Sequence, residues 1–476
     1  MYRKKTKAFI IITCLLLSAF LLSGCGKSEK NEEKNKDLDK KISAKLDAYQ
    51  NDLMDNEDAV KSNKDIRNYL INWAKAKGIT YEKDSYDNII MRISSSGKYK
   101  SAPPTAIICS YDRLNYKSSI PVISMALYAA KNNEKTGDLS VIFTQESGHD
   151  FYGIKRLKKT YFKKGTRIFS LNPGEKGMAS ISSGTSSSYK FTQTISKKAP
   201  SYTSAYKICI KGLTTNEPDT LINDITNPIT KLEGLLVSLK NKGIGYEIAA
   251  FKGGVSSNLY APSASLLITV DPNKEEVFTE KMKEETETWN KKNNKKNPEA
   301  KYSFKKAEVP STVVSGNDGN KFVNFMYTTI SGIYEKDEDT NDTVSICNVS
   351  QIDVSGNRII IGAVAHAVSD SKLKAIDTDT ETLCNLSDIR FRKTGHTPLW
   401  KGKKNTDFTD TFAKTYESVT NKKLEYVDST VATGASYIAG KNKDTELISL
   451  TVNKDILNDC TESIIRYLLN SANTKK

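Results

Sequence analysis

The side chains best suited to acid–base or metal chemistry gather in one short stretch. Gln145, Glu146, His149 and Asp150 lie within six residues, and Asp112 follows an earlier apolar run. Imidazole and carboxylate groups are common zinc ligands, and a carboxylate beside a metal-bound water can act as a general base. Asp112, Glu146 and His149 could therefore form a remnant or rebuilt metal site. Such groupings also arise by chance, and solvated loop carboxylates are the simpler interpretation.

The other candidates for chemistry suit structural roles better. His366 lies in the apolar stretch 363–367 and is expected in the core or at the edge of a strand. His396 follows Gly395 and is expected in a connection between domains. The Ser-rich run 180–188 matches neither a phosphate-binding loop nor a nucleophile elbow. We expect it to be a loop that leads into a second domain.

Cys25 suggests a different chemistry. Basic residues at positions 3, 4, 5 and 7 precede an apolar run over 8–22, and Leu22-Ser23-Gly24 leads directly into Cys25. This pattern is typical of a signal peptide, and the run is shorter than the ~20 residues that a spanning helix needs. The site resembles the bacterial lipobox, whose cysteine is acylated after cleavage. The alternative is an ordinary secretory signal with a chance cysteine. We expect a signal peptide over 1–24 and a lipid on Cys25, holding the protein on the outer face of the bacterial cytoplasmic membrane.

Composition limits the partners. The chain has 476 residues and a net charge of +15, and its length suits two or three domains. The basic excess favours anionic surfaces such as lipid headgroups or wall polymers, although solubility explains it more simply. No basic-aromatic motif indicates nucleic acid, and no nucleic-acid partner is expected. Five cysteines remain besides Cys14 and Cys25, without a C-x-x-C pair, which excludes zinc-finger spacing and a disulfide framework.

Apolar patterning predicts alternating strands and helices after a charged tether over 25–45. A helix with one apolar face is expected around 66–73, ending at Gly78. Strands are expected at 88–93, 105–109, 139–144 and 167–171, with helices at 122–130 and 154–161. This alternation favours an α/β sheet with parallel strands, whose carboxyl ends form the functional edge. Those ends carry Asp112, Glu146 and Asn172.

From about residue 202 the pattern changes to two β-α-β-β-type units, which predicts a separate domain. Strands are expected at 205–211, 246–252, 265–270, 312–315, 343–349 and 358–365, and helices at 225–239, 275–292, 321–332 and 369–384. A helix at 408–419, a strand at 447–452 and a helix at 460–469 return to the first domain. The expected domains are therefore 46–198 and 397–476, with 199–396 inserted between them.

This order of elements resembles the co-catalytic zinc peptidase clan, and most closely the bacterial aminoacyl-histidine dipeptidases. The likeness runs from about Asn51 to Leu469. Its segments include 66–70, 88–90, 106–112, 124–127, 142–148, 210–213, 251–254 and 398–401. The resemblance implies an α/β fold: a peptidase-like mixed sheet flanked by helices, with an inserted α+β lid or dimerisation domain. A homodimer would follow from it.

Members of this family hold two zinc ions with two histidines and three acidic residues, and a further Glu acts as general base. The residues at matching positions here are Ser110, about Ser118, Glu146 and Asn172, with Gln145 at the base position. The last family histidine is missing, because no histidine follows His396, and the Gly-containing segment that carries a histidine in the family reads 431–434. Glu146 is the one ligand retained, and the Gln145 amide cannot take a proton at neutral pH. No catalytic residue and no metal ligand are therefore expected, and zinc would be needed only if the family activity survives.

Three functions follow as hypotheses. The main one is a lipid-anchored pseudo-enzyme that binds a peptide, a wall fragment or a protein partner in the old cleft. The alternative is a divergent zinc-dependent dipeptidase that uses Asp112, Glu146 and His149. The third is an interaction lipoprotein that uses its basic surface, which predicts salt-sensitive binding to anionic envelopes.

Overall fold

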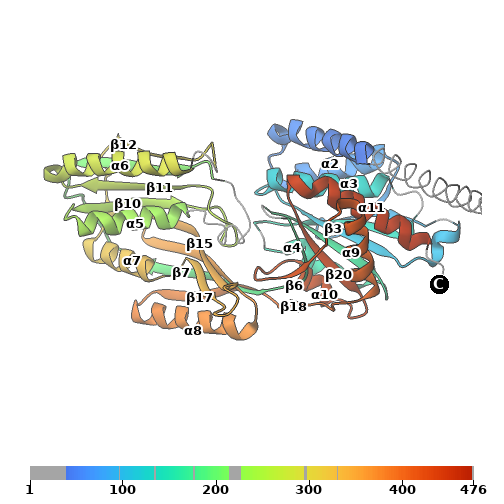
Figure 1. Ribbon diagram of the computed structural model, residues 1–476. Coiled ribbons are helices and arrows are strands. Elements are labelled where there is room, and N and C mark those ends of the chain that lie inside the picture. The colour runs from blue at the N-terminus through green and yellow to red at the C-terminus, as the bar shows by residue number, and fades with distance from the viewer. Residues whose placement is uncertain are drawn as a thin grey trace, which may run out of the picture.

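The computed structural model describes residues 39–95, 97–132, 136–148, 150–174, 177–213, 227–293, 297–329 and 331–473. Within these ranges the chain forms two large sheets that lie side by side, each flanked by helices (Figure 1). Cys25 and the predicted signal peptide lie outside the described residues, and so do His149 and the tether before residue 39. No helix in the described part of the chain is long and apolar enough to cross a bilayer.

The first sheet is mixed, with four parallel strands at its centre. Its strand order is β1-β2-β4-β3-β5-β20-β6-β18, and β19 also pairs with β6. The strands are β1 (Thr80–Lys83), β2 (Ile89–Ile93), β3 (Thr105–Tyr111), β4 (Leu139–Gln145), β5 (Arg167–Pro173), β6 (Met178–Ser183), β18 (Trp400–Lys401), β19 (Tyr426–Ser429) and β20 (Glu446–Val452). The central strands β3, β4, β5 and β20 pair in parallel. Their almost continuous apolar runs are expected for strands that are covered on both faces.

Helices cover both faces of this sheet. They are α2 (Asn63–Ala76), α3 (Tyr116–Lys131), α4 (Tyr152–Arg156), α9 (Asp407–Thr420), α10 (Ala435–Ala439) and α11 (Leu457–Asn473). Successive side chains of a strand point to opposite faces. Ile107 and Cys109 of β3 therefore pack with α3, α9 and α11, whereas Ala106 and Ile108 pack with α4 and α10.

The second sheet is antiparallel throughout the described residues. Its order is β12-β9-β11-β10-β15-β16-β7-β17, and β14 pairs with β15. The strands are β7 (Thr185–Thr194), β9 (Ser204–Lys211), β10 (Tyr246–Gly253), β11 (Ala264–Val270), β12 (Lys301–Ala307), β14 (Gly332–Lys336), β15 (Thr343–Ser355), β16 (Arg358–Ala367) and β17 (Arg390–Thr397). Four helices pack on it and share one core with it: α5 (Pro228–Asn241), α6 (Glu275–Asn293), α7 (Gly316–Thr328) and α8 (Asp370–Leu386).

Short elements complete the described chain. Strands β8 (Lys197–Lys198) and β13 (Val313–Val314) pair with each other. Single 3-10 turns are η1 (Glu57–Ala59), η2 (Gly97–Ser101), η3 (Lys159–Tyr161), η5 (Pro272–Lys274) and η6 (Lys454–Ile456). The helix predicted over 154–161 is therefore α4 followed by the η3 turn, and the helix predicted from 321 begins earlier, at Gly316.

Two predictions about connecting segments are wrong. Residues 39–55 form a helix, and Ile42 and Leu46 are buried in the first core, so the last part of the predicted tether is ordered structure. The Ser-rich run 180–188 is not a loop, because it forms the end of β6 and the start of β7. The second sheet accordingly begins at Thr185.

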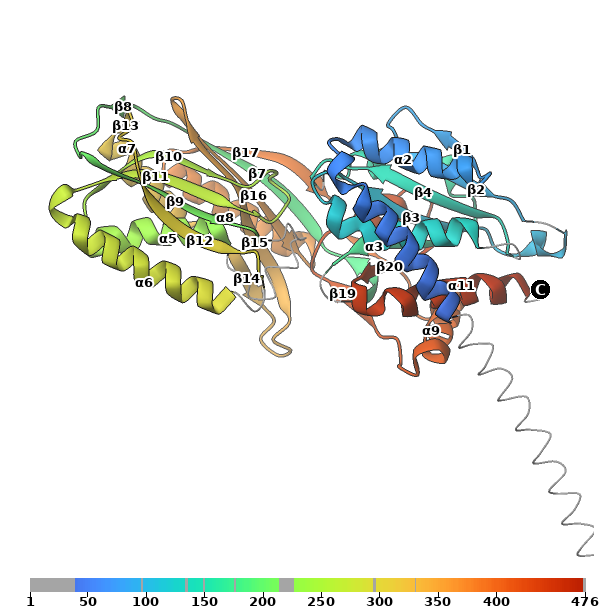
Figure 2. The same cartoon turned by 90° about the horizontal axis from the view of Figure 1, so that it is seen from above.

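The chain passes between the sheets twice, at adjacent places. It leaves the first sheet at Gly184, between β6 and β7, and returns between β17 and β18. Thr397 pairs with Ser186 in the second sheet, and Trp400 pairs with Ser183 in the first. The two passages therefore run next to each other, as Figure 2 shows for β7 and β17. His396, predicted in a domain connection, lies within β17.

Candidate functional site

The positions carried over from the family meet at one edge of the first sheet. Ser110 is the last residue but one of β3, Glu146 directly follows β4, and Asn172 lies near the end of β5. With Thr433 and Gly434 these three residues line a cavity of about 20 Å³, called here the strand-end cavity. Its place at the carboxyl ends of parallel strands is where ligand sites of α/β sheets lie. The cavity has room for about one water molecule.

The Glu146 carboxyl is buried in this cavity, with 4 % of the residue exposed. The backbone N–H of Ile154 lies 3.4 Å from its Oε1 atom. The backbone N–H of Glu146 donates to the Tyr111 carbonyl, and the Asn63 amide donates to the Glu146 carbonyl at 2.6 Å. The residue is therefore fixed from β3, α2 and α4, and the interpretation of Glu146 as a solvated loop residue is wrong.

Asp112 is also buried, at 5 % exposure, but it organises the loop rather than the cavity. Its carboxylate accepts hydrogen bonds from the backbone N–H groups of Leu114, at 3.1 Å, and Gly148. Gly148 has φ +63°, a conformation that glycine adopts without strain. The Ser256 hydroxyl donates to the Gly148 carbonyl at 2.9 Å, which ties this loop to the segment between β10 and β11.

Ser118 and Gln145 do not line the strand-end cavity. Ser118 lies in the first turn of α3, and its hydroxyl donates to the Asn115 carbonyl at 3.0 Å. The Gln145 amide oxygen lies 3.5 Å from Nη1 of Arg67, a guanidinium that also pairs with Asp87 at 2.7 Å. The structure therefore brings together Ser110, Glu146 and Asn172 and leaves Ser118 and Gln145 outside. The role of His149 in a remnant site stays a prediction.

The donors around the strand-end cavity do not fit a zinc pair. They are the hydroxyls of Ser110, Thr144, Ser170 and Thr433, the Asn172 amide and the Glu146 carboxylate. Zinc in proteins takes thiolate, imidazole or carboxylate ligands. The Asn172 amide N–H group donates to the Ser449 hydroxyl at 2.9 Å. Among the described residues, no three His, Cys, Asp or Glu side chains are close enough to share a metal ion.

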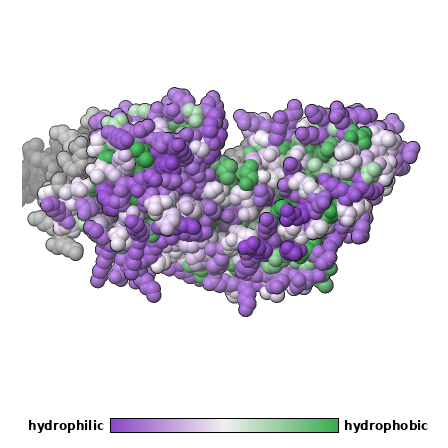
Figure 3. Space-filling view, turned by 180° about the vertical axis from the view of Figure 1, so that it is seen from behind, coloured by the Kyte–Doolittle hydropathy of each residue, from purple (hydrophilic) through white to green (hydrophobic). Residues whose placement is uncertain are grey.

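A larger pocket lies next to this cavity, where the two sheets meet. We call it the interdomain pocket; its volume is about 260 Å³. It is lined by Asp150, Phe151, Lys155, Ser186, Ser188, Ser257, Asn258, Val364, His366, Thr394, Gly395, His396, Thr397 and Ala432. Seen from behind, the surface is hollowed between the two halves of the molecule (Figure 3). Phe151 lines both the pocket and the strand-end cavity and has φ +55°, a strained conformation for a residue with a side chain.

Both described histidines belong to this pocket. His366 of β16 is buried, and its Nδ1 atom accepts the backbone N–H of Ala432 at 3.0 Å. Because that N–H can only donate, the neutral ring carries its proton on Nε2. His396 of β17 is exposed, with Nδ1 lying 3.1 Å from the Ser186 carbonyl. His366 was expected in the core or at the edge of a strand, and the structure places it in the core, within β16.

A lysine supplies positive charge at one side of the interdomain pocket. The Lys155 ammonium donates to the Asp150 carbonyl at 2.6 Å and lies 5.9 Å from the Phe151 ring centroid and 5.1 Å from that of Tyr437. Aromatic faces attract a cation at such distances. The side chain is therefore held in place at the edge of the pocket. Sequence reasoning missed this pocket because its residues come from segments hundreds of positions apart.

The fold of this chain is similar to that of solved peptidase structures. No protein-family model and no curated protein sequence matches the chain. The crystal structure of aminoacylhistidine dipeptidase from Vibrio alginolyticus matches with TM-score 0.54 and 13 % identity, over 88 % of this chain and 94 % of that one. A tripeptidase from Staphylococcus aureus matches with TM-score 0.48 and 10 % identity, over 90 % and 99 %. An M20 family metallo-carboxypeptidase from Sulfolobus solfataricus matches with TM-score 0.41 and 11 % identity, over 85 % and 94 %.

The comparison with the Vibrio alginolyticus dipeptidase confirms the predicted fold class and the predicted likeness. The likeness to the dipeptidase extends over almost the whole of both chains, so it includes both sheets and not the first alone. An identity of 13 % supports a shared fold and no more. The chain has a mixed α/β fold that it shares with this aminoacylhistidine dipeptidase.

Proposed function

We propose that this protein binds a short peptide in the interdomain pocket and does not hydrolyse it. The observation that carries the proposal is the position of that pocket beside a strand-end cavity whose donors are hydroxyls, an amide and the single carboxylate of Glu146. The scaffold thus retains a place for a ligand between the sheets, while the described residues at the strand ends offer no ligand set for zinc.

The lining of the interdomain pocket suits a peptide. Lys155 can pair with a terminal carboxylate, because its ammonium lines the pocket and the Asp150 carbonyl takes one of its three N–H donors. Ser186, Thr394 and Asn258 give the lining a polar character. The Thr394 hydroxyl donates to the Ser188 carbonyl at 3.2 Å, and the Asn258 amide oxygen accepts the Ser188 hydroxyl at 2.6 Å, so these groups are held in place at the pocket wall. The volume of about 260 Å³ is slightly below the usual range for small-molecule pockets, which favours a dipeptide over a longer chain.

Zinc-dependent dipeptide hydrolysis is the second candidate. Its support is the fold shared with a protein named as an aminoacylhistidine dipeptidase, together with the buried carboxyls of Asp112 and Glu146 close to the strand ends. This candidate requires further ligands beyond the described residues, His149 among them.

Removing the Lys155 charge should weaken peptide binding. Calorimetric titration of the full chain with Ala-His should show saturable binding, and Lys155→Ala should reduce the affinity about tenfold, because a charged hydrogen bond contributes about 1.5 kcal/mol or more. Lys158→Ala is the matched control, since Lys158 is an exposed lysine three residues away that does not line the pocket. The control should bind like the wild type.

The same samples separate the two candidates. Incubation with Ala-His and zinc should release no free histidine if the protein only binds. Zinc-dependent release that disappears in Glu146→Gln would establish the hydrolase instead. Absence of binding to Ala-His and to a panel of other dipeptides would overturn the binding proposal.

We also propose attachment to the membrane through a lipid on Cys25, on the sequence pattern around that residue. Two or more acyl chains give a stable anchor, whereas one is marginal. In a bacterial host, the wild type should incorporate labelled palmitate and sediment with membranes. Cys25→Ser should do neither. A membrane-bound, unlabelled wild type would contradict a lipid anchor.

A further inference from the structure

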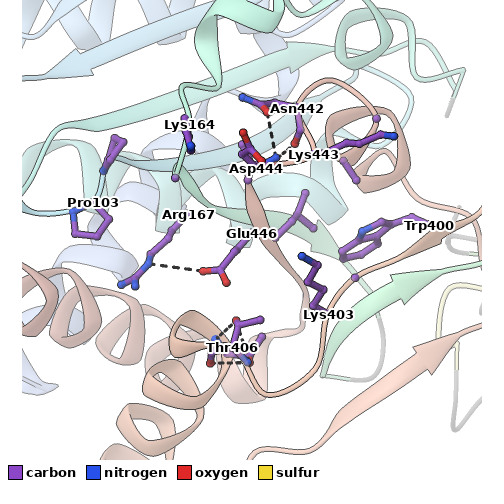
Figure 4. A pocket seen from close by; sticks show the side chains of 18 of the residues that line it. Pro103, Lys164, Arg167, Trp400, Lys403, Thr406, Asn442, Lys443, Asp444 and Glu446 are labelled. Atoms are coloured by element: carbon purple, nitrogen blue, oxygen red, sulfur yellow. Dashed lines mark hydrogen bonds and ion pairs between the residues drawn. The ribbon is translucent and has the colours of Figure 1, made fainter.

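A second large pocket lies at the opposite edge of the first sheet, and we call it the amino-end pocket (Figure 4). Pro103 and Pro104 precede β3, Arg167 begins β5, and Glu446 begins β20. Because these strands are parallel, their first residues share one edge, and the strand-end cavity lies at the other. The volume of about 920 Å³ is ample for a small-molecule ligand.

The charge of the amino-end pocket comes from four lysines. Lys164, Lys401, Lys403 and Lys443 line it and are exposed. They come from segments far apart in the sequence, and no ion pair joins any of them to another described residue. Asp444 is the only acidic side chain lining the pocket besides Glu446. In Figure 4 the Lys403 side chain extends into the space between Trp400 and Glu446.

Arg167 forms part of the pocket wall and is already engaged. Its guanidinium pairs with Asp407, its Nη1 donates to the Tyr467 hydroxyl at 2.8 Å, and its Nε lies 3.9 Å from the Glu446 carboxylate. Two carboxylates against one guanidinium leave this group with one net negative charge. The four lysines outnumber that charge and Asp444 together, so the pocket remains positive.

Flat apolar groups complete the wall. Figure 4 shows Trp400 and Pro103 on opposite sides of the space, and Pro104 and Pro398 also line the pocket. Aromatic and proline rings contact ligand rings at little cost in conformational entropy, since they have few torsions to fix. The amino-end pocket therefore combines a place for an anion with a place for a ring or carbon skeleton.

We propose that the amino-end pocket binds a ligand that carries phosphate groups. Lysine ammonium groups are compact, mobile point charges that pair with phosphate oxygens, and a ligand with several phosphate groups carries enough negative charge to pair with several of the four lysines at once. The single arginine here is held by protein groups, so lysines alone face the ligand. This site is independent of the interdomain pocket and of any peptide bound there.

The probe for this test is inorganic tripolyphosphate, titrated into the full chain at low salt, with citrate as the carboxylate comparison. The triple variant Lys164→Ala/Lys403→Ala/Lys443→Ala should weaken tripolyphosphate binding about tenfold or more. The control variant Lys283→Ala/Lys291→Ala/Lys292→Ala removes the same charge from exposed positions of α6, where alanine favours the helix. Circular dichroism checks that both variants fold.

Saturable binding of tripolyphosphate that only the pocket variant loses supports the proposal. Equal losses in both variants would mean attraction to net charge and would overturn it. No binding by the wild type would overturn it as well. Citrate binding as tightly as tripolyphosphate would overturn the assignment of phosphate. Unchanged Ala-His binding in the pocket variant would show that the two sites are separate, whereas its loss would contradict their independence.

Discussion

Replacing Gly184 with alanine should destabilise the protein by about 3 kcal/mol or more. A Cβ atom at this position would lie 2.6 Å from the Ala367 carbonyl oxygen and closer still to that of Thr430. Both obstacles are backbone atoms, which cannot turn away as a side chain can. Denaturant unfolding, followed by fluorescence and circular dichroism, measures the loss.

The matched control is Gly234→Ala, an exposed glycine in α5 with no atom within 4 Å of the new methyl group. Helix propensity predicts that this change stabilises by about 0.5–1 kcal/mol. The difference in stability between the two variants measures the cost of steric crowding at Gly184. The backbone N–H of Gly184 also donates to the Val431 carbonyl. If Gly184→Ala unfolds within about 1 kcal/mol of the wild type, the three backbone segments do not meet as tightly as the structure shows.

Replacing Glu233 with glutamine should stabilise the protein at pH 8 by about 3 kcal/mol and have little effect near pH 4. Glu233 is 7 % exposed, and its Oε1 atom has no hydrogen-bond partner among the described residues. Burial raises the pKa of this carboxyl from 4.5 to about 7. At about 1.4 kcal/mol per pKa unit, the charged form carries a penalty of about 3 kcal/mol.

Proton linkage determines whether Glu233 makes the folded protein more or less stable as the pH rises. Below pH 4.5 the carboxyl is protonated in both the folded and the unfolded chain, so it contributes no pH dependence. Between pH 4.5 and about 7 the unfolded chain ionises first, so stability falls as pH rises, and above pH 7 the penalty is complete. Glutamine removes this slope. Unfolding at several pH values should therefore show wild type and variant converging toward pH 4.

Glu276→Gln serves as the control, because Glu276 is exposed on the neighbouring helix α6. It should leave the pH dependence unchanged. Parallel curves for Glu233→Gln and the wild type from pH 4 to pH 8 would contradict the raised pKa of Glu233.

The strands and helices with strong apolar patterns could be predicted from the sequence, and those with weak patterns could not. The stripe of Ile66, Leu70 and Trp73 identified α2 because burial of one face imposes helical spacing. Strands β6 and β7 were missed because small serines fill positions that are buried in the structure, and serine is typical of loops. Pairing with strands distant in sequence decided the outcome: β6 pairs with β18, β19 and β20 in the first sheet, and β7 pairs with β16 and β17 in the second.

Part of the candidate site could also be predicted from the sequence, and part could not. Ser110, Glu146 and Asn172 could be placed together because each ends a predicted parallel strand, and parallel strands end at one edge. The burial of Glu146 and Asp112 could not be predicted, because it depends on helix α4 and on the loop hydrogen bonds. The interdomain pocket could not be predicted from the sequence either, because it forms only where β16 and β17 lie against residues 150–155.

The adjacent passages between the sheets have a consequence for folding. The first sheet needs β20 beside β5 and β6, although the whole second sheet separates them in the sequence. Closing so long a loop in an unfolded chain costs conformational entropy that grows with the logarithm of its length. Once the second sheet has formed, the pairing of Thr397 with Ser186 holds both ends of the loop together. If the inserted sheet folds first, it shortens the effective loop between β6 and β20. The pairing of β20 with β5 and β6 then costs less conformational entropy and should form faster.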